Sequence, residues 1–288
     1  MKKGNVLPGA ETVGRGPALP MLPFELDKFW EQWDSPRPQA IALLGSYARG
    51  DAGPFSDVDL LFLMAADAPP PTRTSFLVEG RLVTVNAVRP DQIDGWFTEP
   101  EQAVNGVAAL RDALPVEDPD GLFVGVQHSA RAFAWNEALQ AKADRYASRE
   151  LVGLIEEAHK GLEGLRRNDT GRLLNARFGL SWLLAGLMRV QRGILGNSDN
   201  SFYDDVRASL GRDSRWSRLL ATAFGIHRAD HTPPSLHEEI VAGLQLYCET
   251  ARLLAPILQP EDRPLIDATV RRIETELSAT TTIHKGME

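Results

Sequence analysis

Four short runs within residues 1–90 carry the alternating or continuous apolar pattern that is typical of β-strands. They are Ala40 to Leu44, Val58 to Met64, Ser75 to Val78 and Arg81 to Val88. Glu79-Gly80 separates the last two runs, and a two-residue connection with glycine favours a β-hairpin. Before them, Leu22 to Trp33 has apolar residues at helical spacing. The first half of the chain therefore predicts a small mixed sheet preceded by a helix.

From about Tyr146 onward the pattern changes to long amphipathic segments without a strand signal. These segments are Arg149 to Arg167, Gly171 to Leu195, Phe202 to Leu210, Trp216 to Phe224, Leu236 to Leu258 and Asp262 to Leu277. In the second segment the apolar positions recur at steps of three and four residues, which predicts one buried helix face. They are Leu173, Ala176, Leu180, Leu183, Leu187, Val190 and Ile194. The second half therefore predicts an all-α bundle.

This change of pattern predicts an α+β protein with two domains. A length of 288 residues is enough for two modest domains with separate cores. We expect a flexible, Gly- and Pro-rich segment at residues 1–20, a mixed-sheet domain at 21–144 and a C-terminal helical domain at 145–288.

The charge is distributed unevenly between the two halves. Residues 1–144 hold 12 Lys and Arg against 20 Asp and Glu, whereas residues 145–288 hold 19 of each. An acidic first half disfavours a stable nucleic-acid partner and favours metal ions or a cationic substrate. The single cysteine, Cys248, and the lack of a signal-like or membrane-spanning apolar run predict a cytoplasmic protein without a membrane partner.

Residues 43–64, LLGSYARGDAGPFSDVDLLFLM, combine several features that favour a metal site. Side chains alternate between the two faces of a strand, so Asp57 and Asp59 should project to the same side, about 7 Å apart along the chain. Two carboxylates so close repel each other unless a cation lies between them. Magnesium suits such a site, because it binds one or two carboxylates together with substrate phosphates.

The Gly45-Ser46 step of the same stretch favours a phosphate site. Glycine lets the backbone approach a ligand closely, and Ser46 is expected to cap a short helix over Tyr47 to Gly50 whose free N–H groups bind an anion. Arg49 adds a positive charge nearby. The segment is therefore expected to hold a nucleoside triphosphate by its phosphates beside the metal.

Together, Gly45-Ser46, a spacer that ends at Ser56, and Asp57-Val58-Asp59 closely resemble the signature of the polymerase-β-like nucleotidyltransferase superfamily. The resemblance implies a nucleotidyltransferase domain in which Asp57 and Asp59 hold the metal. The implied nucleotide-binding residues are Gly45, Ser46, Arg49 and Ser56.

A domain of this size followed by a helical half also resembles the two-domain antibiotic nucleotidyltransferases of the kanamycin type. This resemblance implies that a nucleoside monophosphate is transferred from a Mg²⁺-bound triphosphate, with ATP expected, to a hydroxyl of a small molecule, releasing pyrophosphate. The acidic first half favours an aminoglycoside-like cation as acceptor. The acceptor, the preferred base and the oligomeric state are open at this point.

The chain departs from the superfamily pattern at its third carboxylate, because Thr84 stands at that position. One explanation is that Glu156 or Glu157, on the first helix of the second half, acts as general base, although both also suit a hydrated helix face. A second is that the strand register is wrong and that Glu79 or Asp91 supplies the ligand. A third is that the protein binds nucleotides without turnover.

Two other functions compete with transfer to a small molecule. Thr84 is the reason to consider a weakened or inactive nucleotide-binding regulatory protein. The other is a nucleotidyltransferase of the toxin–antitoxin kind that acts on protein or tRNA. The helical half lacks an Arg followed four to six residues later by a His, which disfavours the ribonuclease helices found beside some small nucleotidyltransferases.

Overall fold

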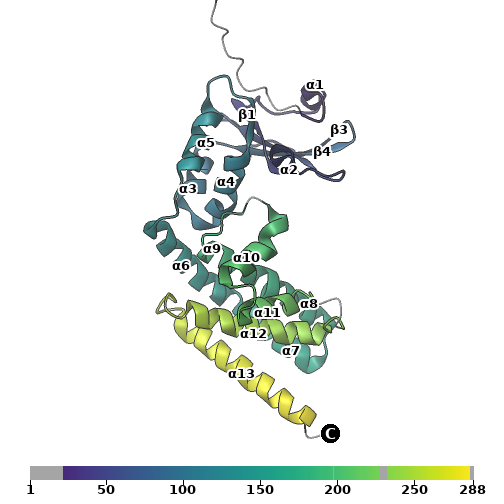
Figure 1. The fold of residues 1–288 in the computed structure, drawn as a ribbon, viewed down its shortest axis with the longest axis vertical. Coiled ribbons are helices and arrows are strands. Elements are labelled where there is room, and N and C mark those ends of the chain that lie inside the picture. The colour runs from purple at the N-terminus through teal and green to yellow at the C-terminus, as the bar shows by residue number, and fades with distance from the viewer. Residues whose placement is uncertain (1–21, 197, 228–231, 286–288) are drawn as a thin grey trace, which may run out of the picture. The chain divides into compact units, whose positions relative to one another are not determined.

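A computed structural model describes residues 22–196, 198–227 and 232–285, with side chains described as far as residue 279 (Figure 1). The segment 1–20, which was predicted to be flexible, lies outside the described residues. The chain forms two compact units. Of the described residues, the first unit contains 22–87 and 113–124, and the second contains 88–112 and those from 125 onward. The domain boundary near residue 144 stays a prediction.

The first unit is built on one five-stranded sheet with the strand order β3-β4-β2-β1-β5 (Figure 1). The strands are β1 (Ala40–Leu43), β2 (Val58–Leu63), β3 (Ser75–Val78), β4 (Arg81–Val88) and β5 (Leu114–Glu117). β1 is antiparallel to both β2 and β5, and β3 is antiparallel to β4. The mixed sheet and the α+β class predicted from the sequence are confirmed.

The β3–β4 hairpin turns at the predicted dipeptide. Glu79 and Gly80 both have positive φ, 49° and 76°, so the turn needs two residues in the left-handed region. Glycine adopts that conformation without steric cost. The turn fixes the register that pairs Ser75 with Thr84 and Leu77 with Leu82. This register decides which β4 side chains lie beside the two aspartates.

One face of the sheet packs against α1 (Leu26–Trp30) through a cluster of aromatic rings. Phe29 is fully buried and lies 5.0 Å from Phe76 and 5.7 Å from Phe62 between ring centroids. Trp33 lies 5.0 Å from Phe62. The helix is shorter than the predicted span from Leu22 to Trp33. It begins at Leu26 and ends at Trp30, and Trp33 contacts the sheet from the residues after the helix.

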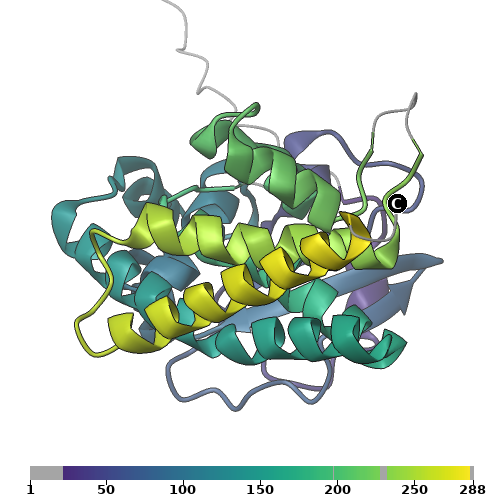
Figure 2. The same cartoon turned by 90° about the horizontal axis from the view of Figure 1, so that it is seen from below.

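Among the described residues from 88 onward, the regular elements other than β5 and the end of β4 are helices. They are α3 (Pro90–Thr98), α4 (Pro100–Asp112), α5 (Leu122–Ala132), α6 (Glu137–Gly153), α7 (Ile155–Arg167), α8 (Thr170–Phe178), α9 (Leu184–Gln191), α10 (Phe202–Leu210), α11 (Arg215–Ala223), α12 (Leu236–Leu254) and α13 (Arg263–Lys285), with a π-helical turn η1 (Gly179–Leu183) and a 3₁₀ turn η2 (Asp199–Ser201). In the second unit α7, α12 and α13 lie side by side (Figure 2). The helical second half predicted from the sequence is confirmed.

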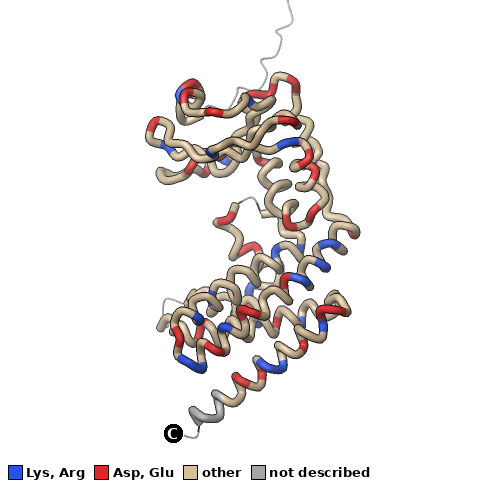
Figure 3. Tube along the Cα trace, turned by 180° about the vertical axis from the view of Figure 1, so that it is seen from behind, with Lys and Arg blue, Asp and Glu red and all other residues tan. Residues whose placement is uncertain are grey.

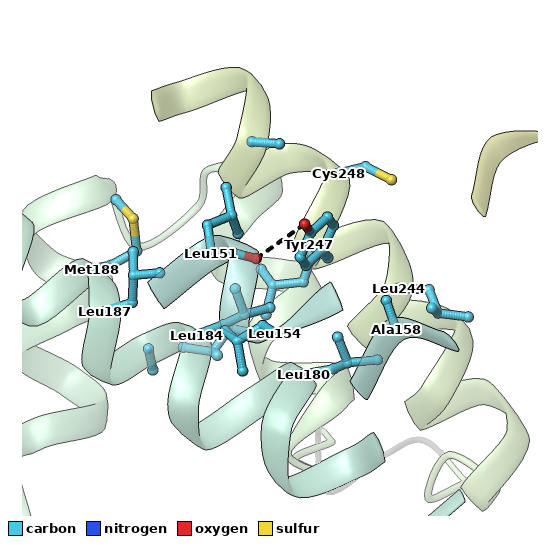
Figure 4. Close-up of a cluster of buried hydrophobic side chains, with 14 of the residues drawn as sticks. Leu151, Leu154, Ala158, Leu180, Leu184, Leu187, Met188, Leu244, Tyr247 and Cys248 are labelled. Carbon is cyan, nitrogen blue, oxygen red and sulfur yellow. Dashed lines mark hydrogen bonds between the residues drawn. The ribbon is translucent and has the colours of Figure 1, made fainter. Parts of the chain in front are cut away.

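The core of the second unit forms where α12 crosses α7 and the α8–η1–α9 segment (Figure 4). Leu180 is fully buried there, and a Cβ built at Gly243 would lie only 2.8 Å from its Cβ. Glycine therefore allows the close approach of the two helices. The buried Tyr247 hydroxyl donates a hydrogen bond to the Leu151 carbonyl at 3.1 Å, which satisfies it in an apolar setting.

Two of the predicted helices are interrupted. The segment Arg149 to Arg167 is interrupted at Leu154, where α6 ends and α7 begins. The segment Gly171 to Leu195 contains the π-helical turn and ends at Gln191. The wider turn rotates Leu183 out of the core to 41% exposure and leaves Leu184 buried at 0%. The predicted apolar face is therefore wrong at Leu183.

Lys and Arg are interspersed with Asp and Glu along the helices of the second unit (Figure 3). Examples are the ion pairs Arg166–Glu163 at 2.7 Å and Arg212–Asp204 at 3.0 Å. Within the described ranges, no helix combines the length and the apolar character needed to cross a bilayer.

Candidate nucleotide and acceptor sites

The two aspartates of the sequence motif lie together on the first unit's sheet, on either side of Thr84. Asp57 directly precedes β2 and Asp59 is its second residue. The Thr84 hydroxyl, on β4, lies 3.0 Å from Asp57 Oδ2 and 3.1 Å from Asp59 Oδ1. Thr84 therefore lies beside both carboxylates, where the superfamily resemblance places the third carboxylate.

The alternative strand register is wrong. Glu79 lies in the hairpin turn, where its carboxylate accepts a hydrogen bond from the Glu25 backbone N–H at 3.2 Å. Asp91 lies in the first turn of α3 and pairs with Arg89 at 3.4 Å. Within the first unit, Thr84 and not Glu79 lies beside the aspartates. In the folded protein, a threonine hydroxyl thus lies where the superfamily resemblance implies a third carboxylate.

The hydroxyl between the aspartates satisfies them incompletely. Thr84 has one proton, which it can donate with good geometry to one carboxylate at a time. Burial and the charge of Asp57 raise the pKa of Asp59, while the Thr84 hydrogen bond and Arg49 act in the opposite direction. Without a cation, the two carboxylates therefore compete for the single Thr84 proton, and their mutual repulsion is left uncompensated.

We expect the metal-free protein to lose stability as pH rises through the raised pKa of Asp59. The folded state holds this proton more tightly than the unfolded chain, whose pKa is near 3.8, so the neutral carboxyl stabilises the fold fully below that value and the contribution is lost above the folded-state pKa. The melting temperature measured against pH in EDTA should fall more steeply for the wild type than for Asp59→Asn. Parallel curves would contradict this expectation.

Gly45 brings the start of α2 (Gly45–Arg49) against Asp59. Its φ is 64°, and a Cβ built on it would lie 2.3 Å from Asp59 Oδ2. Leu44 donates its N–H to the Asp59 carbonyl at 2.8 Å, which fixes the two chain segments together. A glycine is therefore required here for both its conformation and its size.

The other predicted nucleotide-binding residues surround this point. Ser46 lies inside α2, and Leu44 takes the N-cap position, so the prediction that Ser46 caps the helix is wrong because Gly45 is already helical. Arg49 contacts Asp51 at 3.4 Å and is near enough to Asp59 to lower its pKa. The Ser56 hydroxyl accepts a hydrogen bond from the Gly53 N–H at 2.9 Å, which ties the loop before the aspartates.

These residues fit one magnesium ion. Two carboxylates and a hydroxyl converge as hard oxygen donors, and the remaining coordination positions suit water and phosphate oxygens. A third acidic ligand is missing, since the described part of the chain contains no group of three or more His, Cys, Asp or Glu arranged to hold a metal.

The two glutamates predicted as candidate bases have different surroundings in the second unit. Glu156 is 75% exposed on the surface of α7, whereas Glu157 is 18% exposed and lines a cavity. Lys160 contacts Glu156 at 3.0 Å and Glu157 at 2.9 Å. These hydrogen bonds raise the pKa of Lys160, and the bond to Glu157 has the larger effect. Of these two glutamates, Glu157 is the one that lies at a concave surface.

The cavity beside Glu157 has a volume of about 540 Å³ and lies entirely within the second unit. Four carboxylates, one guanidinium and three aromatic rings are part of its lining. They are Glu101, Glu150, Glu157, Asp199, Arg189, Tyr146, Trp182 and Phe202. Such a lining suits a ligand with positive charges and flat apolar faces.

The charges around the cavity act on each other. Burial and the carboxylates of Glu150 and Glu101 raise the pKa of Tyr146. Burial lowers the pKa of Arg189, although Asp199 and Asp205 oppose it. Arg189 donates long hydrogen bonds to backbone carbonyls of Val104 and Gly196, at 3.4 and 3.3 Å, so it is engaged with the protein. Carboxylates thus outnumber guanidinium groups in the lining, although Glu150, Glu157 and Asp199 each have an ion-pair partner.

The comparisons with known proteins gave one family match and similar solved structures. Residues 26–104 match a family described as nucleotidyltransferase domain, a range that contains Gly45, both aspartates and Thr84. No curated protein sequence matches the chain. The structure is similar to a nucleotidyltransferase-like protein from Exiguobacterium sibiricum, with 14% identity over 90% of this chain and 88% of that chain and a TM-score of 0.44. A kanamycin-type subfamily stays a prediction.

Proposed function

We propose that the protein binds a nucleoside triphosphate with Mg²⁺ and transfers its nucleoside monophosphate to a hydroxyl of a small cationic molecule. The observation that carries this proposal is the convergence of Asp57 and Asp59 on Thr84, inside the range that matches the nucleotidyltransferase domain. The carboxylates would hold the metal, which when bound neutralises phosphate charge during transfer.

The remaining roles belong to the chain's own residues. Ser46 and the backbone at Gly45 bind phosphate oxygens, and Arg49 adds positive charge. Transfer forms a bond from the acceptor oxygen to the α-phosphorus and breaks the bond to the bridging oxygen, so pyrophosphate leaves. Glu157 takes the acceptor's proton as general base, a role for which exposed Glu156 is less suited.

The cavity in the second unit supports a cationic acceptor. Its carboxylates attract ammonium groups, and its aromatic rings contact the apolar faces of a ring compound. An aminoglycoside-like molecule has both features and also carries the hydroxyls that transfer requires. This assignment is compatible with the acidic balance of the sequence.

A second function is favoured by one observation. Thr84 supplies a neutral hydroxyl where a third anion would strengthen the metal site. A protein that binds a nucleotide without turning it over would need only the phosphate and metal contacts. It would act as a regulatory nucleotide-binding protein.

Turnover of ATP labelled at its α-phosphate distinguishes these functions. Purified protein with Mg²⁺ and a panel of aminoglycosides and simpler polyols should give a labelled small molecule, with Asp59→Asn as the inactive control. Binding of Mg²⁺-ATP with no labelled product from any acceptor would favour the regulatory function. Label transferred to proteins or tRNA in a lysate would instead indicate a macromolecular substrate.

Ser46→Ala is expected to weaken Mg²⁺-ATP binding by at least about tenfold, because a hydrogen bond to a charged group contributes about 1.5–3 kcal/mol. Adenosine should bind the variant as it binds the wild type, since it lacks the phosphates. Calorimetry with both ligands checks this expectation. An equal loss for ATP and adenosine would show that Ser46 does not contact phosphate.

A further inference from the structure

The π-helical turn Gly179–Leu183 lies where α7 meets the α8–α9 segment, opposite Glu157. Turns of this kind are uncommon and are frequent at functional sites. Gly179 begins the turn and is buried. A glycine inside a helix is destabilising by about 1 kcal/mol relative to alanine, so its presence here needs a local reason.

The reason is the side chain of Glu157. A Cβ built on Gly179 would lie 2.4 Å from Glu157 Cγ, 2.8 Å from its Cβ and 3.3 Å from its Cδ. These distances are far shorter than a normal carbon–carbon contact of about 3.5–4.0 Å. Any side chain at position 179 would therefore displace the glutamate from its place against the helix backbone.

The same turn also shapes the wall beside Glu157. Trp182 lines the cavity, and its ring lies 5.0 Å from Phe202 and 5.7 Å from Phe224 between centroids. One Glu157 oxygen pairs with Lys160, while Oε2 is buried without a hydrogen-bond partner among the described residues. A single turn thus holds both the carboxylate and an aromatic ring at one cavity.

We propose that Gly179 is a positioning residue, and that the π-helical turn fixes the Glu157 carboxylate beside Trp182 for an amine-bearing acceptor. This inference rests on the proposed function only for what the carboxylate does. The position of the carboxylate does not depend on the proposed function, and the experiment measures that position in protein without substrate.

The test compares Gly179→Ala with Gly171→Ala. Gly171 lies on α8 outside the cavity, and its nearest contact for a built Cβ is Asp169 Oδ1 at 3.4 Å, an ordinary distance. Protein carrying ¹³C-labelled glutamate gives a carboxyl signal for Glu157, identified by its loss in Glu157→Gln. We expect Gly179→Ala to move this signal and Gly171→Ala to leave it unchanged.

Stability provides the second measurement. Gly179→Ala should lower the melting temperature by about 3–10 °C through overpacking. Glu157→Gly removes all three contacts, so the double variant should be as stable as Glu157→Gly alone. Should Gly179→Ala fail to fold, recovery of folding in the double variant supports the inference, and failure of both overturns it.

Turnover separates this inference from the proposed function. Where the wild type transfers label to an aminoglycoside, Gly179→Ala should lower kcat at least tenfold, as Glu157→Gln does, with the KM for ATP unchanged. A Glu157 signal that shifts in Gly179→Ala, combined with a wild type that shows no turnover, would refute the proposed function and leave the positioning role standing. An unshifted Glu157 signal in folded Gly179→Ala would overturn the inference whatever the turnover.

Discussion

Asp57→Asn and Asp59→Asn are each expected to abolish Mg²⁺-dependent nucleotide binding while the fold survives. Asparagine keeps the shape of the side chain and removes the charge that a divalent cation needs. Loss of a residue that merely supports a metal ligand typically costs 10–100-fold in affinity, so loss of a ligand should exceed about 100-fold. Calorimetry with Mg²⁺-ATP at neutral pH measures the effect, and circular dichroism checks the fold.

Asp67→Asn is the matched control for these variants. Asp67 is exposed and follows β2 in the same unit, so it offers the same change of charge away from the site. It should bind Mg²⁺-ATP as the wild type does. If Asp57→Asn and Asp59→Asn also bound Mg²⁺-ATP normally, the aspartates would not be metal ligands.

The arrangement of Asp57, Asp59 and Thr84 follows from the sequence because it depends on short-range rules. Side chains alternate along a strand, which places the two aspartates on one face of β2. The alternation in β4 buries Val83 and Val85 and leaves Thr84 on the opposite face. The Glu79-Gly80 turn fixes where that strand begins. Each rule acts over a few residues, so reading them needs no knowledge of the tertiary structure.

The cavity around Glu157 does not follow from such rules, because its lining comes from helices far apart in the sequence. Glu101 lies on α4, a helix that the apolar pattern did not reveal. Pro90 and Pro100, which usually indicate breaks, are instead the first residues of α3 and α4, a position that proline tolerates. The sequence therefore did not predict α4, the helix that contributes Glu101 to the cavity lining.

The π-helical turn shows a different limit of pattern reading. Both Leu183 and Leu184 are apolar, so the sequence fits a regular helix with Leu183 buried as well as a wider turn with Leu184 buried. The choice depends on contacts from other helices, among them Glu157 against Gly179. Local periodicity carries no information about such contacts.

Thr84→Glu should strengthen Mg²⁺ binding and raise or create nucleotidyl transfer. The Thr84 hydroxyl lies within 3.1 Å of both aspartates, so a carboxylate at this position faces the metal site. Opposite unit charges 4 Å apart attract by about 4 kcal/mol near a protein surface, which after desolvation leaves an expected gain of at least about tenfold in Mg²⁺ affinity. Without a cation the third negative charge should lower the melting temperature, because it repels the other two.

Asn86→Glu is the control, since it adds the same charge two residues further along the same face of β4, about 7 Å away. It should change Mg²⁺ affinity less than Thr84→Glu does. A folded Thr84→Glu with the metal affinity and transfer rate of the wild type would place Thr84 outside the functional site.

Transfer by the wild type that is lost in Glu157→Gln and kept in Glu156→Gln would indicate an enzyme with a weakened metal site. Transfer that appears only in Thr84→Glu would indicate instead that the natural protein binds its nucleotide without turnover, because the hydroxyl at position 84 leaves the site one anion short.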